Sequence, residues 1–145
     1  MKRLVSLAAA LFAGIFMLMG CEETKIRSEK LPEPAKAFIT QYFPGTEVVF
    51  AERERDNGTR HYNVRLADGT EIDFDSDGNW TSVDCEYSTL PSGILLPAME
   101  TYISENYDTA EAYKVEKESG GYEVGITGGL ELIFNASGEF IRESR

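Results

Sequence analysis

The sequence is poor in the residues that build metal centres and cross-linked folds. Its 145 residues include two cysteines and one histidine, His61. Two cysteines provide neither a disulfide framework nor zinc-ligand spacing, and a single histidine excludes multi-histidine metal sites. No GxSxG elbow, P-loop or HExxH motif occurs, and His61 beside Arg60 on the polar side of a strand is typical of a solvated or paired residue. We therefore do not expect an enzyme.

Positive charge is also scarce. The chain has 14 Lys+Arg against 25 Asp+Glu, which gives a formal net charge of −11. Phosphate backbones bind to basic faces, so nucleic acid is not an expected partner. Hydrophobic residues make up 42% of the sequence, which excludes a disordered chain, and long apolar runs are too few for a multi-span membrane protein. These values predict an acidic globular protein.

One apolar run, residues 4–19, follows the basic Lys2 and Arg3. At about 16 residues it is shorter than the ~20 that a spanning helix needs, and it is typical of a signal-peptide core. The run ends in Leu-Met-Gly-Cys, which resembles a bacterial lipobox with Cys21 as the lipid acceptor. The sequence therefore predicts a lipoprotein signal peptide at residues 1–20, lipidation of Cys21 and a polar tether at residues 21–30. The alternative is an ordinary secretory signal or a short membrane anchor with an incidental cysteine.

Two segments of the remaining chain are similar to each other. Residues 37–43 match 101–107, residues 62–66 match 122–126, and residues 69–74 match 129–134. The offset falls from 64 to 60 along the chain. This change indicates a four-residue deletion at a hairpin tip, where a duplicated fold tolerates it. We expect two repeats, residues 31–86 and 87–145, that form one compact domain.

Each repeat is expected to form one helix followed by a four-stranded antiparallel meander. The first repeat has an apolar stripe at helical spacing, formed by Phe38, Ile39, Tyr42 and Phe43. A period-two pattern then predicts a strand that buries Tyr62, Val64 and Leu66. A unit of about 60 residues buries little surface alone, so the two units should share one core and one sheet. The predicted class is α+β, a tandem repeat with helices packed on one face of a curved sheet.

The motifs of the first repeat carry a resemblance to a known family. They are Ala35-Lys36-x-Phe38-Ile39-x-x-Tyr42-Phe43-Pro44, then Tyr62-x-Val64-x-Leu66-x-Asp68-Gly69, then Phe74-Asp75-x-x-Gly78-x-Trp80. Over residues 31–143 the chain resembles the PepSY-like periplasmic proteins of Bacteroidota, although the second repeat has Asn135 in place of Asp and Phe140 in place of Trp. The resemblance implies a fold like that of the β-lactamase inhibitor protein, with one sheet face open. It also implies a role in protein binding or inhibition.

An acidic turn in the first repeat is a candidate calcium site. Its potential ligands are Asp73, Asp75, Asp77 and Asp84. Acidic residues at loop positions 1, 3 and 5, with Gly78 at position 6, match the front of a calcium loop. The strand-like flanks and an Asp rather than a Glu at position 12 argue against such a site. The alternative is a hairpin turn whose Asp and Gly residues serve backbone geometry. No other cofactor is expected.

Cationic and aromatic residues suggest a surface for a protein partner. The candidate residues are Arg53, Arg55, Arg60, His61, Arg65 and Tyr113. The basic residues fall on the first hairpin of a strongly acidic chain, and exposed tyrosine suits protein recognition. The alternative is charge balancing by cross-strand pairs with the acidic residues of the same hairpin, Glu52, Glu54 and Asp56.

Together these observations predict a lipid-anchored protein of the bacterial cell envelope, in the periplasm or on the outer surface, that binds a partner protein through the open face of its sheet. Inhibition of that partner is one form that the binding could take. The alternative function is a calcium-responsive structural protein of the envelope with a weak site at the turn formed by residues 73–77.

Overall fold

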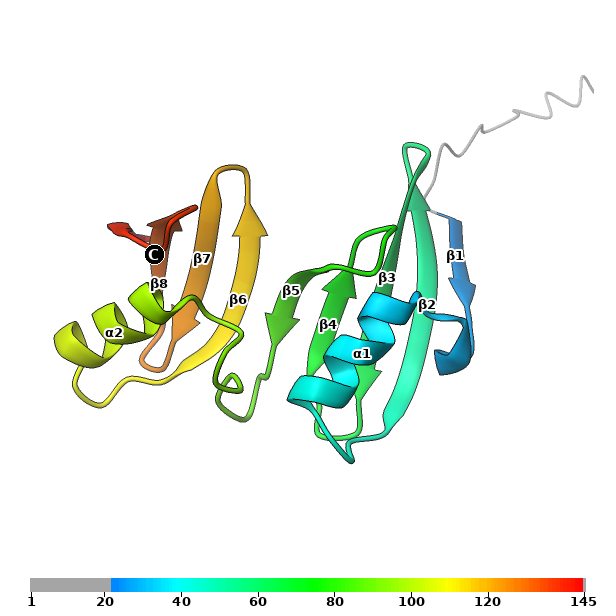
Figure 1. The fold of residues 1–145 in the computed structure, drawn as a ribbon, viewed down its shortest axis with the longest axis horizontal. Coiled ribbons are helices and arrows are strands. Elements are labelled where there is room, and N and C mark those ends of the chain that lie inside the picture. Colours follow the sequence, from blue (N-terminus) through cyan, green and yellow to red (C-terminus); the bar gives the residue numbers. More distant parts are fainter. Residues whose placement is uncertain (1–21, 145) are drawn as a thin grey trace, which may run out of the picture.

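Nine strands pair in chain order, from β1 to β9, into one antiparallel sheet (Figure 1). The computed structural model describes residues 22–144 of the chain. The strands are β1 (Glu22–Lys25), β2 (Val48–Asp56), β3 (Thr59–Leu66), β4 (Glu71–Phe74), β5 (Trp80–Asp84), β6 (Ala112–Glu118), β7 (Gly121–Ile126), β8 (Leu130–Asn135) and β9 (Phe140–Ser144). The helices are the 3₁₀-helix η1 (Ser28–Lys30) and the α-helices α1 (Glu33–Tyr42) and α2 (Pro97–Asn106). Within this part of the chain, no helix has the length and apolar character needed to cross a membrane.

This architecture shows that the expected fold class was wrong. The protein is mostly β, with two α-helices of 10 residues each, and is not a tandem α+β repeat of helix-plus-meander units with helices packed on the sheet. The strands form one continuous sheet because β5 pairs directly with β6, as in the pair Val83 and Val115. A ninth strand, β1, was missed because its polar sequence has no period-two pattern. It joins the sheet through backbone pairing, which needs no apolar side chain.

The segments predicted at the start of the chain fall partly outside the described residues. The predicted signal peptide, residues 1–20, and the predicted lipid acceptor Cys21 both lie outside them. The predicted tether, residues 21–30, contains β1 and η1. In β1, Lys25 pairs with Glu52 of β2, so the polar segment forms one edge of the sheet.

The core lies on one face of the sheet. Buried residues pair across β2 to β8 in one row: Ala51, Val64, Ile72, Val83, Val115, Val124 and Leu132. Every member of this row is at most 3% exposed. The predicted alternation of β3 is confirmed, because Val64 and Leu66 are buried and the intervening Arg65 is exposed. The row therefore extends without interruption through the junction between β5 and β6.

Each α-helix contacts the core face of the sheet through a few side chains. In α1, Ala35 and Ile39 are buried, and the Phe38 ring lies edge-on to Phe74 of β4 with 5.9 Å between ring centroids. In α2, Tyr102 makes the corresponding contact with Phe134 of β8, at 5.8 Å. Both helices are thus on the core side (Figure 1), and the opposite face of the sheet has no covering helix among the described residues.

Candidate functional site

The uncovered face of the sheet carries two rows of side chains, and we refer to it as the open face. Strand pairing fixes both rows, because residues that oppose one another across antiparallel strands point to the same side. The first row is Lys25, Glu52, Asn63, Asp73, Ser82, Glu116, Glu123, Ile133 and Arg142. The second row is Phe50, Arg65, Glu71, Asp84, Lys114, Gly125, Glu131 and Ser144. Carboxylates outnumber cationic side chains on this face.

Ion pairs and hydrogen bonds connect neighbouring strands in the first half of the open face. His61 Nε2 lies 2.6 Å from Glu54 Oε2, and Arg65 Nη2 lies 2.6 Å from Glu71 Oε1. Next to the His61 pair, a hollow of about 310 Å³ is lined by residues that include Arg60 and Thr81. Charge balancing within the hairpin thus occurs at His61, whose partner Glu54 lies on β2, whereas Arg65 pairs with Glu71 of β4. Exposed pairs of this kind add little stability, about 0–1 kcal/mol each.

The predicted partner-binding residues do not form one patch. His61 and Arg65 point to the open face, whereas Arg53 of β2 opposes Tyr62 and so points to the core side. Arg55 lies two residues after Arg53 on β2, so it points to the same side as Arg53, where it opposes Arg60. The strand pattern brings together the His61 and Arg65 positions, and it separates them from Arg53 and Arg55.

Two aromatic side chains lie on the open face, one from β2 and one from β6. A bulge in β2 between Val48 and Phe50 places Phe50 opposite Arg65, on the open face. A corresponding bulge in β6 contains Tyr113, whose ring would lie 3.2 Å from a β-carbon placed on Gly125. The missing side chain of Gly125 therefore leaves room for the Tyr113 ring above β7.

Sequence reasoning predicted Tyr113 and missed Phe50. The run Val48–Ala51 is apolar at every position, so alternation alone cannot decide which residue points to which face. The bulge determines the orientation. It inserts one extra residue between Val48 and Phe50, so these two residues point to opposite faces of the sheet. An apolar run without alternation at the start of a strand is the signal that could have marked this position.

Carboxylates on the open face lie close enough to affect one another. Burial raises the pKa of Glu52 above its usual value, and the hydrogen bond and charge of Glu54 raise it further. Burial likewise raises the pKa of Glu123, with the hydrogen bond and charge of Glu131 adding to the effect. Glu52 and Glu54 are two residues apart on one strand, which the sequence could have revealed. Glu123 and Glu131 meet only through the pairing of β7 with β8.

Three of the four predicted calcium ligands, Asp73, Asp75 and Asp84, accept hydrogen bonds within the protein. Asp75 Oδ1 accepts hydrogen bonds from the backbone N–H groups of Asp77 and Asn79, at 3.0 and 2.9 Å. Asp84 accepts a bond from the backbone N–H of Glu86, and Asp73 accepts one from the Asn63 amide. Across residues 22–144, no group of three or more His, Cys, Asp or Glu side chains is placed to hold a metal ion.

The second half of the sheet has a neutral residue in the same role as Asp75. Asn135 Oδ1 accepts hydrogen bonds from the backbone N–H groups of Ser137 and Glu139, at 3.0 and 2.9 Å. An uncharged amide oxygen thus supports the β8–β9 turn as the carboxylate supports the β4–β5 turn. Turn geometry alone accounts for the acceptor at each position.

Comparisons with known proteins place these features in a family. A family model described as "Putative beta-lactamase-inhibitor-like, PepSY-like" matches residues 12–65 and 60–142. No curated protein matches the chain. A solved structure from Bacteroides vulgatus, described as a "putative periplasmic protein of unknown function", is 35% identical with a TM-score of 0.81, and the match covers 87% of this chain and 100% of that one.

Two further solved structures are similar over nearly their whole length. One is a "putative periplasmic protein" of the DUF2874 family from Bacteroides vulgatus, 31% identical with a TM-score of 0.81, covering 86% of this chain and 98% of that one. The other is a "putative calcium-regulated periplasmic protein" from Bacteroides thetaiotaomicron, also 31% identical with a TM-score of 0.81, covering 85% and 97%. The two family-model matches together span most of the chain, and the chain therefore belongs to the PepSY-like family of β-lactamase-inhibitor-like proteins.

Proposed function

We propose that this protein is a lipid-anchored binding module of the bacterial cell envelope that recognises a partner protein through the open face of its sheet. The observation that carries the proposal is the open face itself, where carboxylates outnumber cationic side chains and two bulges place the rings of Phe50 and Tyr113. Phe50 lies opposite Arg65, with Lys25 Nζ 5.5 Å from the centre of its ring. The partner surface that fits this face is basic, because opposite charges steer association and fix orientation.

The electrostatics of the open face support a cationic partner. Burial raises the pKa of Glu52 and of Glu123, and the neighbouring carboxylates Glu54 and Glu131 raise it further because they hold like charges close together. A lysine or arginine from a partner would relieve this repulsion and gain a charge-assisted hydrogen bond. Aromatic residues supply much of the affinity at protein interfaces, so Phe50 and Tyr113 are the expected anchors.

The family comparison supports both the envelope location and an inhibitory form of binding. The matched family is described as β-lactamase-inhibitor-like, and the similar structures are described as periplasmic proteins. An acidic face with aromatic anchors could block an enzyme by covering a basic surface at the mouth of its active site. Activity against a target enzyme is then a direct test, once affinity capture has identified the partner.

Binding is tested by affinity capture from envelope extract, with the full chain as bait. Tyr113→Ser and Phe50→Ser should each weaken capture of the partner by about tenfold or more, as removal of an interface anchor does. Tyr87→Ser is the matched control, because Tyr87 is 81% exposed but lies in the loop after β5. Capture that resists both open-face substitutions would show that the partner binds elsewhere.

Anchoring by Cys21 is tested separately. Cys21→Ala should move the protein from the membrane fraction to the soluble fraction and abolish labelling with palmitate, because the cysteine at the end of the lipobox carries the lipid. A variant with a serine in place of Cys85 serves as the control, since Cys85 is buried in the core. Unchanged membrane partition of Cys21→Ala would contradict lipidation.

Calcium response is the second candidate function, and the similar protein described as calcium-regulated favours it. Calcium that binds the acidic turn should raise the melting temperature of the wild type more than that of Asp75→Asn, which keeps the turn acceptor and loses the charge. A ligand at a hundredfold excess over its Kd stabilises by about 2.7 kcal/mol, and by about 0.4 kcal/mol when it equals its Kd. Equal shifts in the two proteins up to ~10 mM calcium would exclude this turn as the site.

A further inference from the structure

Two arginines lie side by side near the tip of the hairpin that β2 and β3 form. Arg55 of β2 opposes Arg60 of β3. The Ile26 N–H donates a 2.9 Å hydrogen bond to the Ala51 carbonyl, so Ala51 and every second residue after it in β2 direct their backbone groups toward β1. Arg55 and Arg60 are therefore a non-hydrogen-bonded pair. In such a pair the facing side chains approach most closely, with Cβ atoms about 4.5–5.5 Å apart.

No carboxylate of residues 22–144 neutralises this arginine pair. The ion pairs in this part of the chain involve other residues. Glu22 of β1 opposes Arg55, but their side chains form no ion pair. Like charges that face each other across two strands destabilise a sheet. The pair is therefore a local excess of positive charge on a chain whose formal net charge is −11.

The two arginines border a hollow that also offers hydroxyl donors. The hollow has a volume of about 410 Å³ and is lined by Arg55, Gly58, Thr59, Arg60 and Ser76. Ser76 comes from the turn between β4 and β5, so two neighbouring hairpins contribute to the hollow. Both arginines are exposed, which leaves the hollow open to solvent. Its guanidinium and hydroxyl groups are hydrogen-bond donors that suit an anion with several oxygen atoms.

We propose that this hollow binds a phosphate group between the guanidinium groups of Arg55 and Arg60. A guanidinium presents a planar fork of N–H donors that matches the spacing of phosphate oxygens. A phosphate between the two side chains replaces their mutual repulsion with charge-assisted hydrogen bonds. The site lies on the core side of the hairpin, so it is separate from the open face, to which the proposed function assigns the partner protein.

The phosphate belongs to the headgroup of an anionic membrane lipid. Glu22, which opposes Arg55, is bonded directly to Cys21, the proposed lipid acceptor. Consecutive Cα atoms are about 3.8 Å apart and paired strands are about 5 Å apart, so a lipid on Cys21 holds the arginine pair at the membrane surface. This source of the phosphate rests on the proposed lipid anchor, whereas the phosphate site itself does not.

An NMR titration with inorganic phosphate tests the site. The protein is the isotope-labelled chain from residue 21 onward, which contains the whole described fold, with Cys21→Ala so that no lipid is attached. Phosphate should shift the Nε–Hε resonances of Arg55 and Arg60 with a millimolar Kd. Arg55→Gln and Arg60→Gln should each weaken binding about twofold to fivefold, the range expected for an exposed charge pair, and the double variant should abolish it. Unchanged resonances at phosphate concentrations far above the millimolar range would overturn the site.

Two further variants make the result specific to the hollow. Arg27→Gln removes the same charge from an exposed position before η1 that does not line the hollow, and it should leave the phosphate affinity unchanged. Glu22→Gln removes the carboxylate that faces Arg55 and should strengthen binding by up to about twofold. An equal loss of affinity in Arg27→Gln and Arg55→Gln, or weaker binding by Glu22→Gln, would overturn the proposal.

Chemical modification of the arginines distinguishes a lipid phosphate from free phosphate. Cys21 of the same chain is coupled to a maleimide lipid in vesicles, and Cys85 does not compete because it is 1% exposed. Phenylglyoxal then modifies the accessible guanidinium groups, and peptide mass spectrometry gives the rate at each arginine. Phosphatidylglycerol vesicles should slow the modification of Arg55 and Arg60 about threefold or more relative to Arg27, and zwitterionic phosphatidylcholine vesicles should slow it less.

The two arms separate the site from its ligand source. If phosphate binds in solution but phosphatidylglycerol vesicles protect Arg55 and Arg60 no more than Arg27, the lipid source is overturned and the site takes a free phosphate. The vesicle anchor is supplied chemically, so this result does not depend on lipidation in the cell, which fractionation of Cys21→Ala tests. Failure of both arms would overturn the phosphate site and leave the open-face proposal unaffected.

Discussion

Glu123 and Glu131 are two carboxylates of the open face that lie close enough to repel each other. They lie on the paired strands β7 and β8, and burial, together with the hydrogen bond and charge of Glu131, raises the pKa of Glu123. Like charges on facing strands destabilise a sheet by a fraction of a kcal/mol. This repulsion lowers the free energy of unfolding of the isolated protein. A cationic partner that binds the open face would remove the repulsion and stabilise the fold.

Glu123→Gln should therefore raise the free energy of unfolding at pH 7 by a few tenths of a kcal/mol to about 1 kcal/mol. A carboxyl whose pKa is higher in the folded state favours the fold when it is protonated, and that contribution is lost as the pH rises through the folded pKa. The advantage of the variant should accordingly vanish below about pH 4, where the wild-type carboxyl is protonated in both states. Urea unfolding at pH 7 and pH 4 measures this, with Glu105→Gln as the control. An equal gain at both pH values would contradict the electrostatic explanation.

Cys85 differs from the charged carboxylates of the open face, because it is a titratable group that the fold keeps neutral. Its side chain is 1% exposed, and burial raises its pKa to about 11. At pH 8 the folded protein should then contain about one thiolate per thousand molecules at this position, and thiolate is the reactive form. Iodoacetamide at pH 8 should leave Cys85 unmodified in the folded protein and alkylate it fully in urea, as measured by peptide mass spectrometry. Rapid alkylation of the folded protein would indicate that β5 opens locally.

At the scale of single elements, the hairpin turns are fixed to the helices by glycines. Gly78, in the β4–β5 turn, has a φ of +87°, and a β-carbon there would lie 2.7 Å from Pro32 Cβ and 3.1 Å from the Ala35 backbone nitrogen. The turn thus fits against the first turn of α1 because position 78 has no side chain. Gly138 makes a similar approach to the start of α2, with Ala98 Cβ 3.3 Å from the corresponding position.

Gly78→Ala should destabilise the protein by about 2–4 kcal/mol, since it adds a steric clash with α1 to the strain of a positive φ. Gly58→Ala is the matched control. Gly58 has a φ of +80° in the β2–β3 turn, and a β-carbon there would have no neighbour within 4 Å, so the substitution should cost only about 1 kcal/mol. Chemical denaturation of both variants measures the difference. Equal losses of stability in the two variants would show that the close contact between the β4–β5 turn and α1 does not add to the effect of Gly78→Ala.

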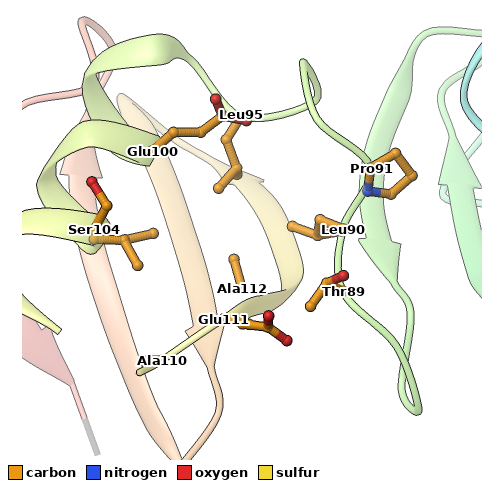
Figure 2. Close-up of a pocket in the computed structure, with 10 residues that line it drawn as sticks. Thr89, Leu90, Pro91, Leu95, Glu100, Ser104, Ala110, Glu111 and Ala112 are labelled. Atoms are coloured by element: carbon orange, nitrogen blue, oxygen red, sulfur yellow. The ribbon is translucent and has the colours of Figure 1, made fainter. Parts of the chain in front are cut away.

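Individual strands were more predictable from the sequence than the way they combine. The alternation in β3 predicted the buried Val64 correctly, because period-two burial is a local property of a half-buried strand. The orientation of Phe50 was not predictable, since it depends on a bulge that no residue type specifies. The same limit applies to Glu123 and Glu131, whose proximity requires the register of two strands. The pocket between α2, the loop before α2 and the start of β6 (Figure 2) was not foreseen either, because its walls come from these three separate segments.

At the scale of the whole molecule, the junction between β5 and β6 decides whether the protein unfolds as one unit. Only three residue pairs form this junction, including Val83 with Val115, but both valines are 0% exposed. The Trp80 ring also lies 6.5 Å from the Tyr122 ring across the junction, and Lys117 Nζ lies 4.1 Å from the centre of the Trp80 ring. Separating the halves would expose this apolar surface, so we expect a single cooperative unit.

Leu132→Ala in β8 tests this expectation. Removing a fully buried leucine side chain costs about 2–5 kcal/mol. If the sheet unfolds as one unit, hydrogen exchange at the Val64 amide in β3 should accelerate by about thirtyfold or more, although β3 lies in the other half. Native-state hydrogen exchange followed by NMR measures the rate, with Leu132→Ile as the milder control. Acceleration confined to β6–β9 would show that the halves open independently.

The strict chain order of the strands also determines how the protein responds to a pulling force. The described chain enters the sheet at one edge strand, β1, and leaves it from the opposite edge strand, β9 (Figure 1). Tension between the two ends therefore acts across the strands, and it loads the hydrogen bonds of an edge strand one after another rather than all together. Unfolding under tension should therefore begin at an edge strand and need little force, and the rest of the cooperative unit should then follow. A module pulled from both ends would in this way give way under a light load.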